Sequence, residues 1–338
     1  MNSLQRTLDF INNRKVDRPP FHPIVMRFTA QYAGVNYRDF CLDSQTKCMA
    51  NIKCARDFGY DWVNVMSDPY AEAEAFGVKV EYPLNSLPLA KQFPLSDHSG
   101  FKNLKAPVIR EHERLMARIR EIEIYKKELG DRYFITGWVE GPLAEYCDLK
   151  DISEALLDFY ENPDEMVKAM DIITSFSMEF IAAQVKAGAH CIGIGDAACS
   201  LISPELYQGY IFPREKMLID HAHSLGALIK LHICGNTTAI LPDMIRTGAD
   251  IIDIDHLVTS MEDFIDLLSD KQVFSGNSDP VSVIKDGTPE TIRESVESCF
   301  LKTKHRGIVS AGCEVPAETP IKNFRAYMNA AHGLARYF

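Results

Sequence analysis

Three features of the sequence predict an α/β fold, a single (β/α)8 TIM barrel: the alternation of strands and helices, the absence of a glycine-rich loop, and the number of strands. Short β-branched or aromatic runs alternate with longer segments of helical periodicity along the 338 residues. Such alternation is typical of parallel strands joined by right-handed helical crossovers. Residues 28–34, which follow the first candidate strand, lack the glycine-rich loop of open doubly wound sheets. We therefore expect residues 1–338 to form one barrel domain.

Eight candidate strands follow one another along the chain, which is the number a closed barrel of this type needs. They lie at residues 24–26, 62–65, 133–135, 191–194, 228–231, 251–254, 272–274 and 307–310. The amphipathic segments 163–188, 204–225 and 289–305 lie between them. Each of these segments opens with proline, which is favoured at the first position of a helix.

Two segments depart from this alternation. An N-terminal helical extension is expected before the first strand. Residues 71–105 contain a Val-Lys-Val-Glu-Tyr run and several prolines. We expect this second segment to be an insertion on the rim of the barrel, built as a small hairpin and a loop.

Composition and charge exclude several classes of protein. The net charge of −11 argues against nucleic acid or an acidic membrane surface as the main partner. No run of about 18 apolar residues predicts a membrane span, and the first residues do not resemble a secretory signal. Nine cysteines are an odd number and too few for a disulfide scaffold in this length. A cytoplasmic protein is expected.

Polar side chains gather after the candidate strands, where the active site of a barrel lies. They are Asp68, Glu140, Asp196, His232, Cys234, Asp255, His256, Asn277, Asp279 and Cys313. Because the carboxyl ends of the strands of a barrel share one face, we expect these residues to surround one cavity. Glu140 and Asp196 are expected to line it.

The pair His232 and Cys234, with the distant Cys313, predicts a metal site. Residues two apart on a strand point to the same side, so this imidazole and thiol converge. Cys313 follows another strand of the same ring. One histidine and two cysteines are ligands typical of zinc, and three protein ligands leave a fourth position open for chemistry. The other seven cysteines are expected to pack as small apolar residues.

Three motifs resemble those of the uroporphyrinogen decarboxylase superfamily. They are Leu-His-Ile-Cys-Gly-Asn-Thr at 231–237, Gly-Asn-Ser-Asp-Pro at 276–280 and Gly-Cys-Glu-Val-Pro at 312–316. The resemblance covers nearly the whole chain and is strongest to the cobalamin-dependent methyltransferases with a His-x-Cys…Cys zinc site, the methylcobalamin:coenzyme M methyltransferase type. It implies a (β/α)8 barrel with zinc on His232, Cys234 and Cys313. It also implies a corrinoid (methylcobalamin) presented by a partner protein, because no segment here is a candidate cobalamin-binding domain.

The resemblance to the true decarboxylases is weaker at one important place. Those enzymes carry an Arg-Gln-x-Gly-Arg motif that binds porphyrin carboxylates, whereas residues 27–32 here read Arg-Phe-Thr-Ala-Gln-Tyr. A substrate with many carboxylates needs cationic partners, so this departure argues against porphyrin decarboxylation. Asp68 resembles the catalytic aspartate of the decarboxylases, and we interpret it here as a shared pocket residue.

The expected activity is methyl transfer between the corrinoid and a small-molecule acceptor or donor, with a thiol favoured. Zinc deprotonates a bound thiol or acts as a Lewis acid on a methylated donor, so the direction stays open. Asp255 or His256 is expected beside the metal, and Asn277 and Asp279 are expected to form a cofactor- or substrate-binding loop. Two alternatives remain, namely a decarboxylase and a non-catalytic zinc-binding homologue whose fourth metal position is filled by protein.

Overall fold

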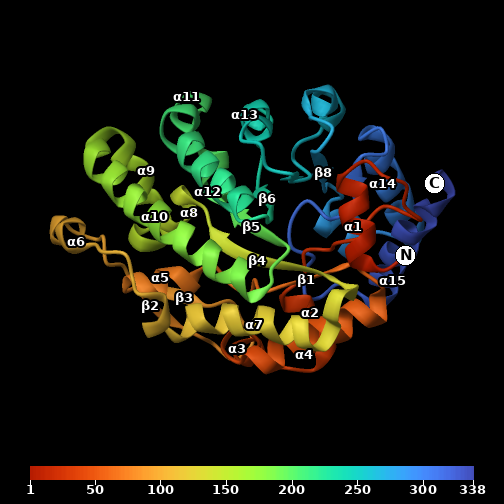
Figure 1. The fold of residues 1–338 in the computed structure, drawn as a ribbon, viewed down its shortest axis with the longest axis horizontal. Helices are drawn as coiled ribbons and strands as arrows, with labels where there is room; N and C mark the ends of the chain where they lie inside the picture. Colours follow the sequence, from red (N-terminus) through yellow and green to blue (C-terminus); the bar gives the residue numbers. More distant parts are fainter.

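Seven parallel strands form a curled sheet at the centre of the molecule, in the order β1-β4-β5-β6-β7-β8-β9 (Figure 1). The computed structural model describes the backbone of residues 1–338 and every side chain except those of His98 and Ser99. The strands are β1 (Trp62–Asn64), β4 (Phe134–Glu140), β5 (Cys191–Gly195), β6 (Leu228–Ile233), β7 (Ile251–Ile254), β8 (Val273–Ser275) and β9 (Gly307–Ile308). All seven residues of β4 are buried, because the strand is covered on both faces.

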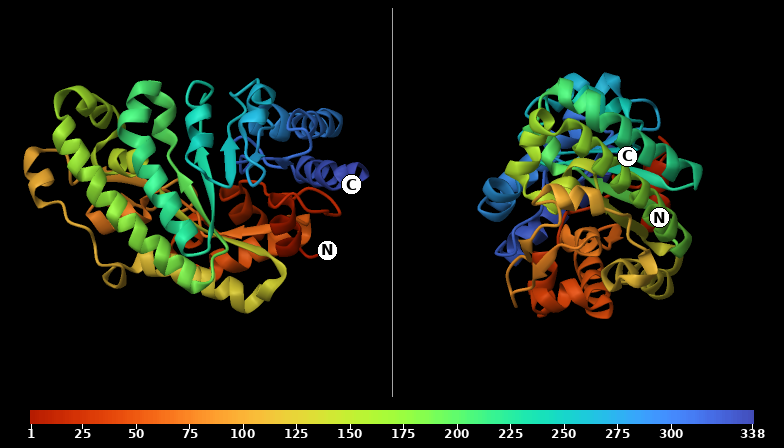
Figure 2. Two further views of the ribbon diagram at one scale, coloured as in Figure 1. Left: turned by 45° about the horizontal axis from the view of Figure 1, so that its top comes forward. Right: turned by 90° about the vertical axis from the view of Figure 1, so that its left-hand side faces the viewer.

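Helices lie around the outside of these strands (Figures 1 and 2). They are α1 (Ser3–Ile11), α2 (Arg27–Ala33), α3 (Tyr37–Leu42), α4 (Ser44–Phe58), α5 (Tyr70–Phe76), α6 (His98–Asn103), α7 (Glu113–Leu129), α8 (Pro142–Lys150), α9 (Ile152–Glu161), α10 (Pro163–Ala187), α11 (Pro204–Leu206), α12 (Phe212–Ser224), α13 (Leu241–Arg246), α14 (Pro289–Lys302) and α15 (Ile321–Gly333). Short 3-10 turns occur at Ile109–Glu111, Gly130–Arg132, Ala197–Leu201, Met261–Leu267 and Leu334–Tyr337, and π turns at Tyr207–Ile211 and Pro280–Lys285. Within the described part of the chain, no helix has both the length and the apolar character needed to cross a bilayer.

The segment 71–105 contains the hairpin that its sequence predicts. β2 (Lys79–Glu81) pairs with β3 (Leu89–Gln92) in an antiparallel sheet of two strands, separate from the central sheet. The helical extension expected at the N-terminus is α1. The two ends of the chain lie side by side, since the ring centroid of Phe10 is 6.4 Å from that of Phe338 (Figure 1).

Residues 20–22 join the two edge strands of the sheet. Phe21 forms a parallel bridge with Val309, directly after β9. The carbonyl of Phe21 accepts the amide hydrogen of Asp61, directly before β1, at 2.8 Å. On the other side, the amide of His22 donates to the carbonyl of Val309 at 2.9 Å. The segment is therefore hydrogen-bonded to both edges.

The prediction of a strand at residues 24–26 is wrong. These residues have no regular secondary structure and line the central cavity instead. Pro23 immediately precedes them and has no amide hydrogen for a strand ladder. An apolar run that lines a cavity has the same composition as a short buried strand, which explains the error. The other seven expected strands are present, and the third extends as far as Glu140.

Asp61 fixes the segment 20–22 against β1 through side-chain contacts. Its fully buried carboxylate accepts the Phe21 amide at 2.8 Å and pairs with Arg6 at 2.6 Å and Arg18 at 2.7 Å. We expect Asp61→Asn to lower the free energy of unfolding by about 2 kcal/mol, because the charged hydrogen bonds from both arginines are weakened. Urea denaturation would measure the loss. Asp131→Asn, which breaks only an exposed pair with Lys126, is the control and should cost less than about 0.5 kcal/mol.

Candidate metal centre and cavity

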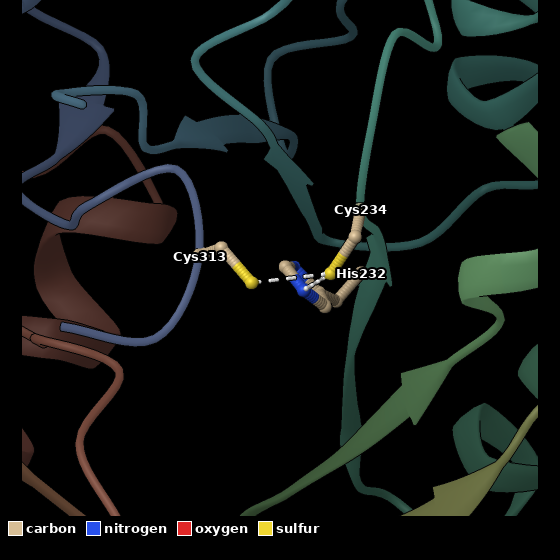
Figure 3. Close-up of side chains that lie close together, drawn as sticks. All are labelled: His232, Cys234 and Cys313. Carbon is tan, nitrogen blue, oxygen red and sulfur yellow. Dashed lines mark hydrogen bonds between the residues drawn. The ribbon is translucent and has the colours of Figure 1, made fainter. Parts of the chain in front are cut away.

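His232, Cys234 and Cys313 meet at the carboxyl end of the sheet (Figure 3). His232 lies near the end of β6 and Cys234 directly after it, so both side chains point to the same side, while Cys313 lies on the loop after β9. Nε2 of His232 is 2.9 Å from Sγ of Cys234, and the two sulfurs are 3.3 Å apart. The three ligand atoms all lie within 4.8 Å of one another.

Asp253 and Lys230 form a buried ion pair next to the imidazole of His232. His232 and Asp253 are register partners on β6 and β7, and Nδ1 of His232 lies 2.6 Å from Oδ2 of Asp253. The same oxygen is 3.0 Å from Nζ of Lys230. The carboxylate therefore directs Nδ1 away from the cysteines and leaves Nε2 facing them.

Proton affinities at this centre are strongly perturbed. Hydrogen bonding from Cys234, and then the neighbouring His232, lowers the pKa of Cys313 to about 4, while the same bond raises the pKa of Cys234. Burial alone would lower the pKa of His232, but contact with Asp253 and Cys313 raises it to about 9. Cys313 is thus the thiolate of the pair, the form that binds metal ions.

The donor set fits zinc. A tetrahedral zinc ion, with bonds of about 2.0–2.3 Å, separates its ligand atoms by roughly 3.5–3.8 Å. The distances of 2.9 Å from His232 to Cys234 and 3.3 Å from Cys234 to Cys313 are about 0.5 Å shorter than this spacing, so a small outward movement of the side chains would admit the ion. The carboxylate of Asp253 on the second imidazole nitrogen matches the support that metal-bound histidines usually have.

A cavity of about 230 Å³ opens beside the three side chains. Alternate residues of the strands line it, as expected where side chains alternate between the two faces of a sheet. The lining residues are His22, Ile24, Val25, Met26, Asn64, Met66, Pro69, Thr136, Trp138, Glu140, Gly195, Ala197, Lys230, His232, Cys234, Cys313 and Glu314. The cavity is therefore mostly apolar, with the metal-binding groups on its wall.

Trp138 lines the cavity because β5 carries two glycines beside it. A Cβ atom added at Gly193 would lie 2.4 Å from the indole, and one at Gly195 would lie 2.5 Å from it. The ring nitrogen donates to Oε1 of Glu140 at 2.7 Å. The Gly-Ile-Gly sequence of β5 thus makes room for the indole inside the sheet.

Gly195→Ala is expected to displace the indole and lower the free energy of unfolding by about 1–3 kcal/mol through overpacking. Tryptophan fluorescence should change as well, because Trp138 is one of only two tryptophans. Gly333→Ala is the matched control, since a Cβ there meets nothing within 4 Å. Equal stabilities for the two variants would contradict this packing argument.

Of the predicted strand-end residues outside the metal-binding group, Glu140 is the one that lines the cavity. Burial, followed by the nearby Glu72, raises its pKa well above the usual range. Asp68 is buried and does not line the cavity. Although burial alone would raise its pKa, the ion pair with Arg114 and the nearby Arg118 lower it. The structure does not place Asp68 on the cavity wall.

Asp196 caps a helix rather than lining the cavity. Its carboxylate accepts the amides of Leu143 at 3.4 Å and Ala144 at 2.7 Å, in the first turn of α8. Its ligand atoms also lie near those of Cys199 and Glu215, all three residues being buried. Burial raises the pKa of Asp196 to about 6 and that of Glu215 well above its usual range.

Asp255 contacts the loop that follows Cys234, and His256 contacts Asp255. Asp255 accepts the amide of Gly235 at 3.0 Å and contacts Nδ1 of His256 at 2.6 Å. Nε2 of His256 is 3.6 Å from Asp279, whose carboxylate caps the π turn at Pro280–Lys285. Neither Asp255 nor His256 lines the cavity. Their contacts fix the position of the loop instead.

Asn277 and Asp279 also lie off the cavity wall. The side-chain amide of Asn277 donates to the carbonyl of Val258 at 2.7 Å and that of Asp255 at 3.3 Å. The loop at 276–280 is therefore joined to the segment after β7.

Sequence reasoning missed the roles of two cavity residues. Glu314 follows Cys313 directly, lines the cavity and accepts the amide of Arg27 at 2.8 Å; burial raises its pKa to about 7. Lys230 lies two residues before His232, and this spacing could have placed it on the same side of the strand. Its partner Asp253 could not be identified without the register of β6 and β7.

A curled parallel sheet with a histidine and two cysteines at the carboxyl ends of its strands defines an α/β protein with a candidate metal centre. The chain belongs to the uroporphyrinogen decarboxylase (URO-D) family, which it matches over residues 2–334.

Methyltransferases and decarboxylases are both among its relatives. It is 29% identical to the methylcobamide:CoM methyltransferase MtbA of Methanosarcina acetivorans over 279 residues, which covers 81% of this chain and 80% of that protein. It is 22% identical to the uroporphyrinogen decarboxylase of Carboxydothermus hydrogenoformans over 343 residues, covering 96% of each. Enzymes of both activities are therefore related to it.

Solved structures support the same fold. A methyltransferase from Methanosarcina mazei superposes with a TM-score of 0.89 at 20% identity, covering 98% of both chains. A B12-independent methionine synthase from Shewanella sp. W3-18-1 superposes with a TM-score of 0.57 at 13% identity, covering 87% of both chains. At these identities the likeness concerns the fold alone.

Proposed function

We propose that the protein is a zinc-dependent methyltransferase. It moves a methyl group between a corrinoid carried on a partner protein and a small molecule, for which a thiol is favoured. The observation that carries this proposal is the convergence of His232, Cys234 and Cys313 on the wall of an apolar cavity. The names of its methyltransferase relatives, MtbA among them, support the reaction class.

We further infer that the fold is a closed barrel of one domain. Residues 20–22 take the place of an eighth strand, because Phe21 is hydrogen-bonded to Asp61 on one side and bridged to Val309 on the other. In this closure residues 20–22 lie between β9 and β1, and Cys313 belongs to the same ring of strand ends as His232.

Each residue of the centre has a defined task in this proposal. His232, Cys234 and Cys313 would hold zinc, which lowers the pKa of a thiol bound to it and acts as a Lewis acid. Asp253 keeps the imidazole oriented. The thiol sulfur forms a bond to the methyl carbon and releases its proton, while the electron pair of the broken cobalt–carbon bond stays with the corrinoid. Trp138 and the apolar wall limit access of water.

The decarboxylase alternative has less support from the cavity. A polycarboxylate substrate needs free cations. Of the cavity-lining residues, Lys230 and His232 already share the carboxylate of Asp253. Asp68, which resembles a decarboxylase residue, is paired with Arg114 away from the cavity wall.

A demethylation assay tests the proposal. Purified full-length protein, with its zinc content measured, is mixed with methylcobalamin and a panel of small thiols, and loss of the methylcobalamin absorbance is followed. We expect turnover that stops when a chelator removes zinc and returns when zinc is restored. Protein that contains about one zinc per chain but turns over no thiol would overturn the thiol proposal. Release of CO2 from a porphyrinogen would favour the decarboxylase.

A further inference from the structure

The cavity beside the metal centre carries carboxyl groups but no free cation. Glu140 and Glu314 line it. Its basic residues are engaged or neutral: Lys230 and His232 contact Asp253 at 3.0 and 2.6 Å, and burial lowers the pKa of His22 well below its usual value. Among the described side chains that line this cavity, none offers an unpaired positive charge to an anionic ligand.

More carboxyl groups lie behind Glu140. Oε1 of Glu72 accepts the backbone amide of Glu140 at 3.2 Å. The other oxygen of Glu72 and both oxygens of Glu145 are buried without a hydrogen-bond partner in the described structure. The guanidinium of Arg118 nearby donates to the carbonyls of Val65 and Asp68 and so is not bonded to these carboxylates. Among the described residues that line the cavity, this side therefore offers a ligand a carboxyl group and no free cation.

Glu140 is well placed to bind a cation. Trp138 donates to Oε1 of Glu140, while Oε2 lies 3.4 Å from the position that a Cβ on Gly195 would occupy, on the cavity side. Burial raises the pKa of Glu140, so it keeps a proton until a cation arrives to favour the ionised form. The neighbouring indole adds a surface that attracts cations.

The distance from Glu140 to the metal centre suits a short molecule. Glu140, Gly195 and His232 are register partners on three adjacent strands. Two strand spacings separate the outer Cα atoms by about 10 Å. The indole of Trp138 lies over Gly195, so a bound molecule would pass over this indole between the carboxyl group and the imidazole.

We propose, resting on the methyltransferase function above, that the small molecule is a short aminothiol. Its ammonium group binds Glu140 beside Trp138, and its sulfur lies at the centre formed by His232, Cys234 and Cys313. Glu140 is then the residue that determines the charge of the substrate. An uncharged thiol of the same length is a weaker substrate, and an anionic thiol is the weakest.

Three thiols of equal length test this order with methylcobalamin as the methyl donor: 2-aminoethanethiol, 2-mercaptoethanol and 2-mercaptoethanesulfonate. Because the thiols differ in intrinsic acidity, the decisive quantity is the ratio of kcat/KM between the wild type and Glu140→Gln for each. We expect this substitution to lower kcat/KM about tenfold for the amine and less than twofold for the alcohol. Glutamine can still accept the bond from Trp138, and Glu205→Gln, at an exposed carboxylate, is the control.

A binding measurement separates this inference from the proposed function. The methyl thioethers of the same three compounds are titrated into metal-free protein, and the tryptophan fluorescence, to which Trp138 and Trp62 contribute, is followed. We expect the amine to bind most tightly and Glu140→Gln to remove that preference. Turnover that is equal or better with the sulfonate would overturn the aminothiol proposal and leave methyl transfer intact. Amine binding at Glu140 without turnover of any thiol would overturn the methyltransferase proposal instead.

Discussion

Cys313→Ala is expected to reduce bound zinc from about one ion per chain to near zero in buffer with micromolar zinc. Structural zinc sites with four ligands contribute about 10–16 kcal/mol, so one ligand accounts for roughly 3–4 kcal/mol. This loss corresponds to an affinity about 100- to 1,000-fold lower. Cys313 supplies the thiolate of the pair and comes from a separate loop, so Cys234 and His232 would remain as only two ligands.

Elemental analysis after dialysis measures this loss, and circular dichroism checks that the variant is folded. Cys54→Ala is the matched control, because Cys54 is a buried free thiol outside the centre. It should keep its zinc. Cys313→Ser, which is nearly isosteric, guards against a packing effect of the smaller alanine. Retention of one zinc per chain in both Cys313 variants would exclude this residue as a ligand.

Asp253→Asn is expected to have the largest effect on stability, about 3–5 kcal/mol. The substitution leaves Lys230 as a buried ammonium group without its anionic partner, and breaking a buried pair in this way is costly. It also removes the carboxylate that orients His232, for which we expect a 10- to 100-fold loss of zinc affinity. Denaturant titration and a zinc competition assay measure the two effects separately.

Two further variants sharpen this test. Asp220→Asn disrupts only an exposed pair with Lys216 and should change stability by less than about 1 kcal/mol. Lys230→Met in the Asp253→Asn background removes the unpaired charge, so we expect it to recover part of the stability but not the zinc affinity. If Asp253→Asn lowers the free energy of unfolding by less than about 1 kcal/mol, this buried ion pair does not stabilise the fold.

Local sequence pattern predicted most of the fold. Seven of eight expected strands are present, because short apolar runs between amphipathic segments are compatible with few structures other than a buried strand. The exception, at 24–26, follows Pro23, and its apolar side chains line a cavity rather than a sheet. The true neighbour of the edge strands is Phe21, whose pairing depends on Val309, far along the chain.

The candidate site was only partly predictable. The spacing of His232 and Cys234 placed both on one side of a strand, which holds for any strand. Several predicted residues, including Asp196 and Asp279, instead cap helical turns, as strand-end carboxylates often do. A polar residue after a strand therefore indicates the correct edge of the sheet without indicating whether it faces the cavity.

The sequence by itself determined the alternation of strands and helices, the ligand types and the shared direction of His232 and Cys234. These properties follow from the periodicity of the backbone and the chemistry of single residues. Only the tertiary structure decided that Cys313 reaches Cys234, that Asp253 supports His232 and that Trp138 lies over the glycines of β5. Such contacts depend on strand order and register, which are set by the packing of segments far apart in the chain.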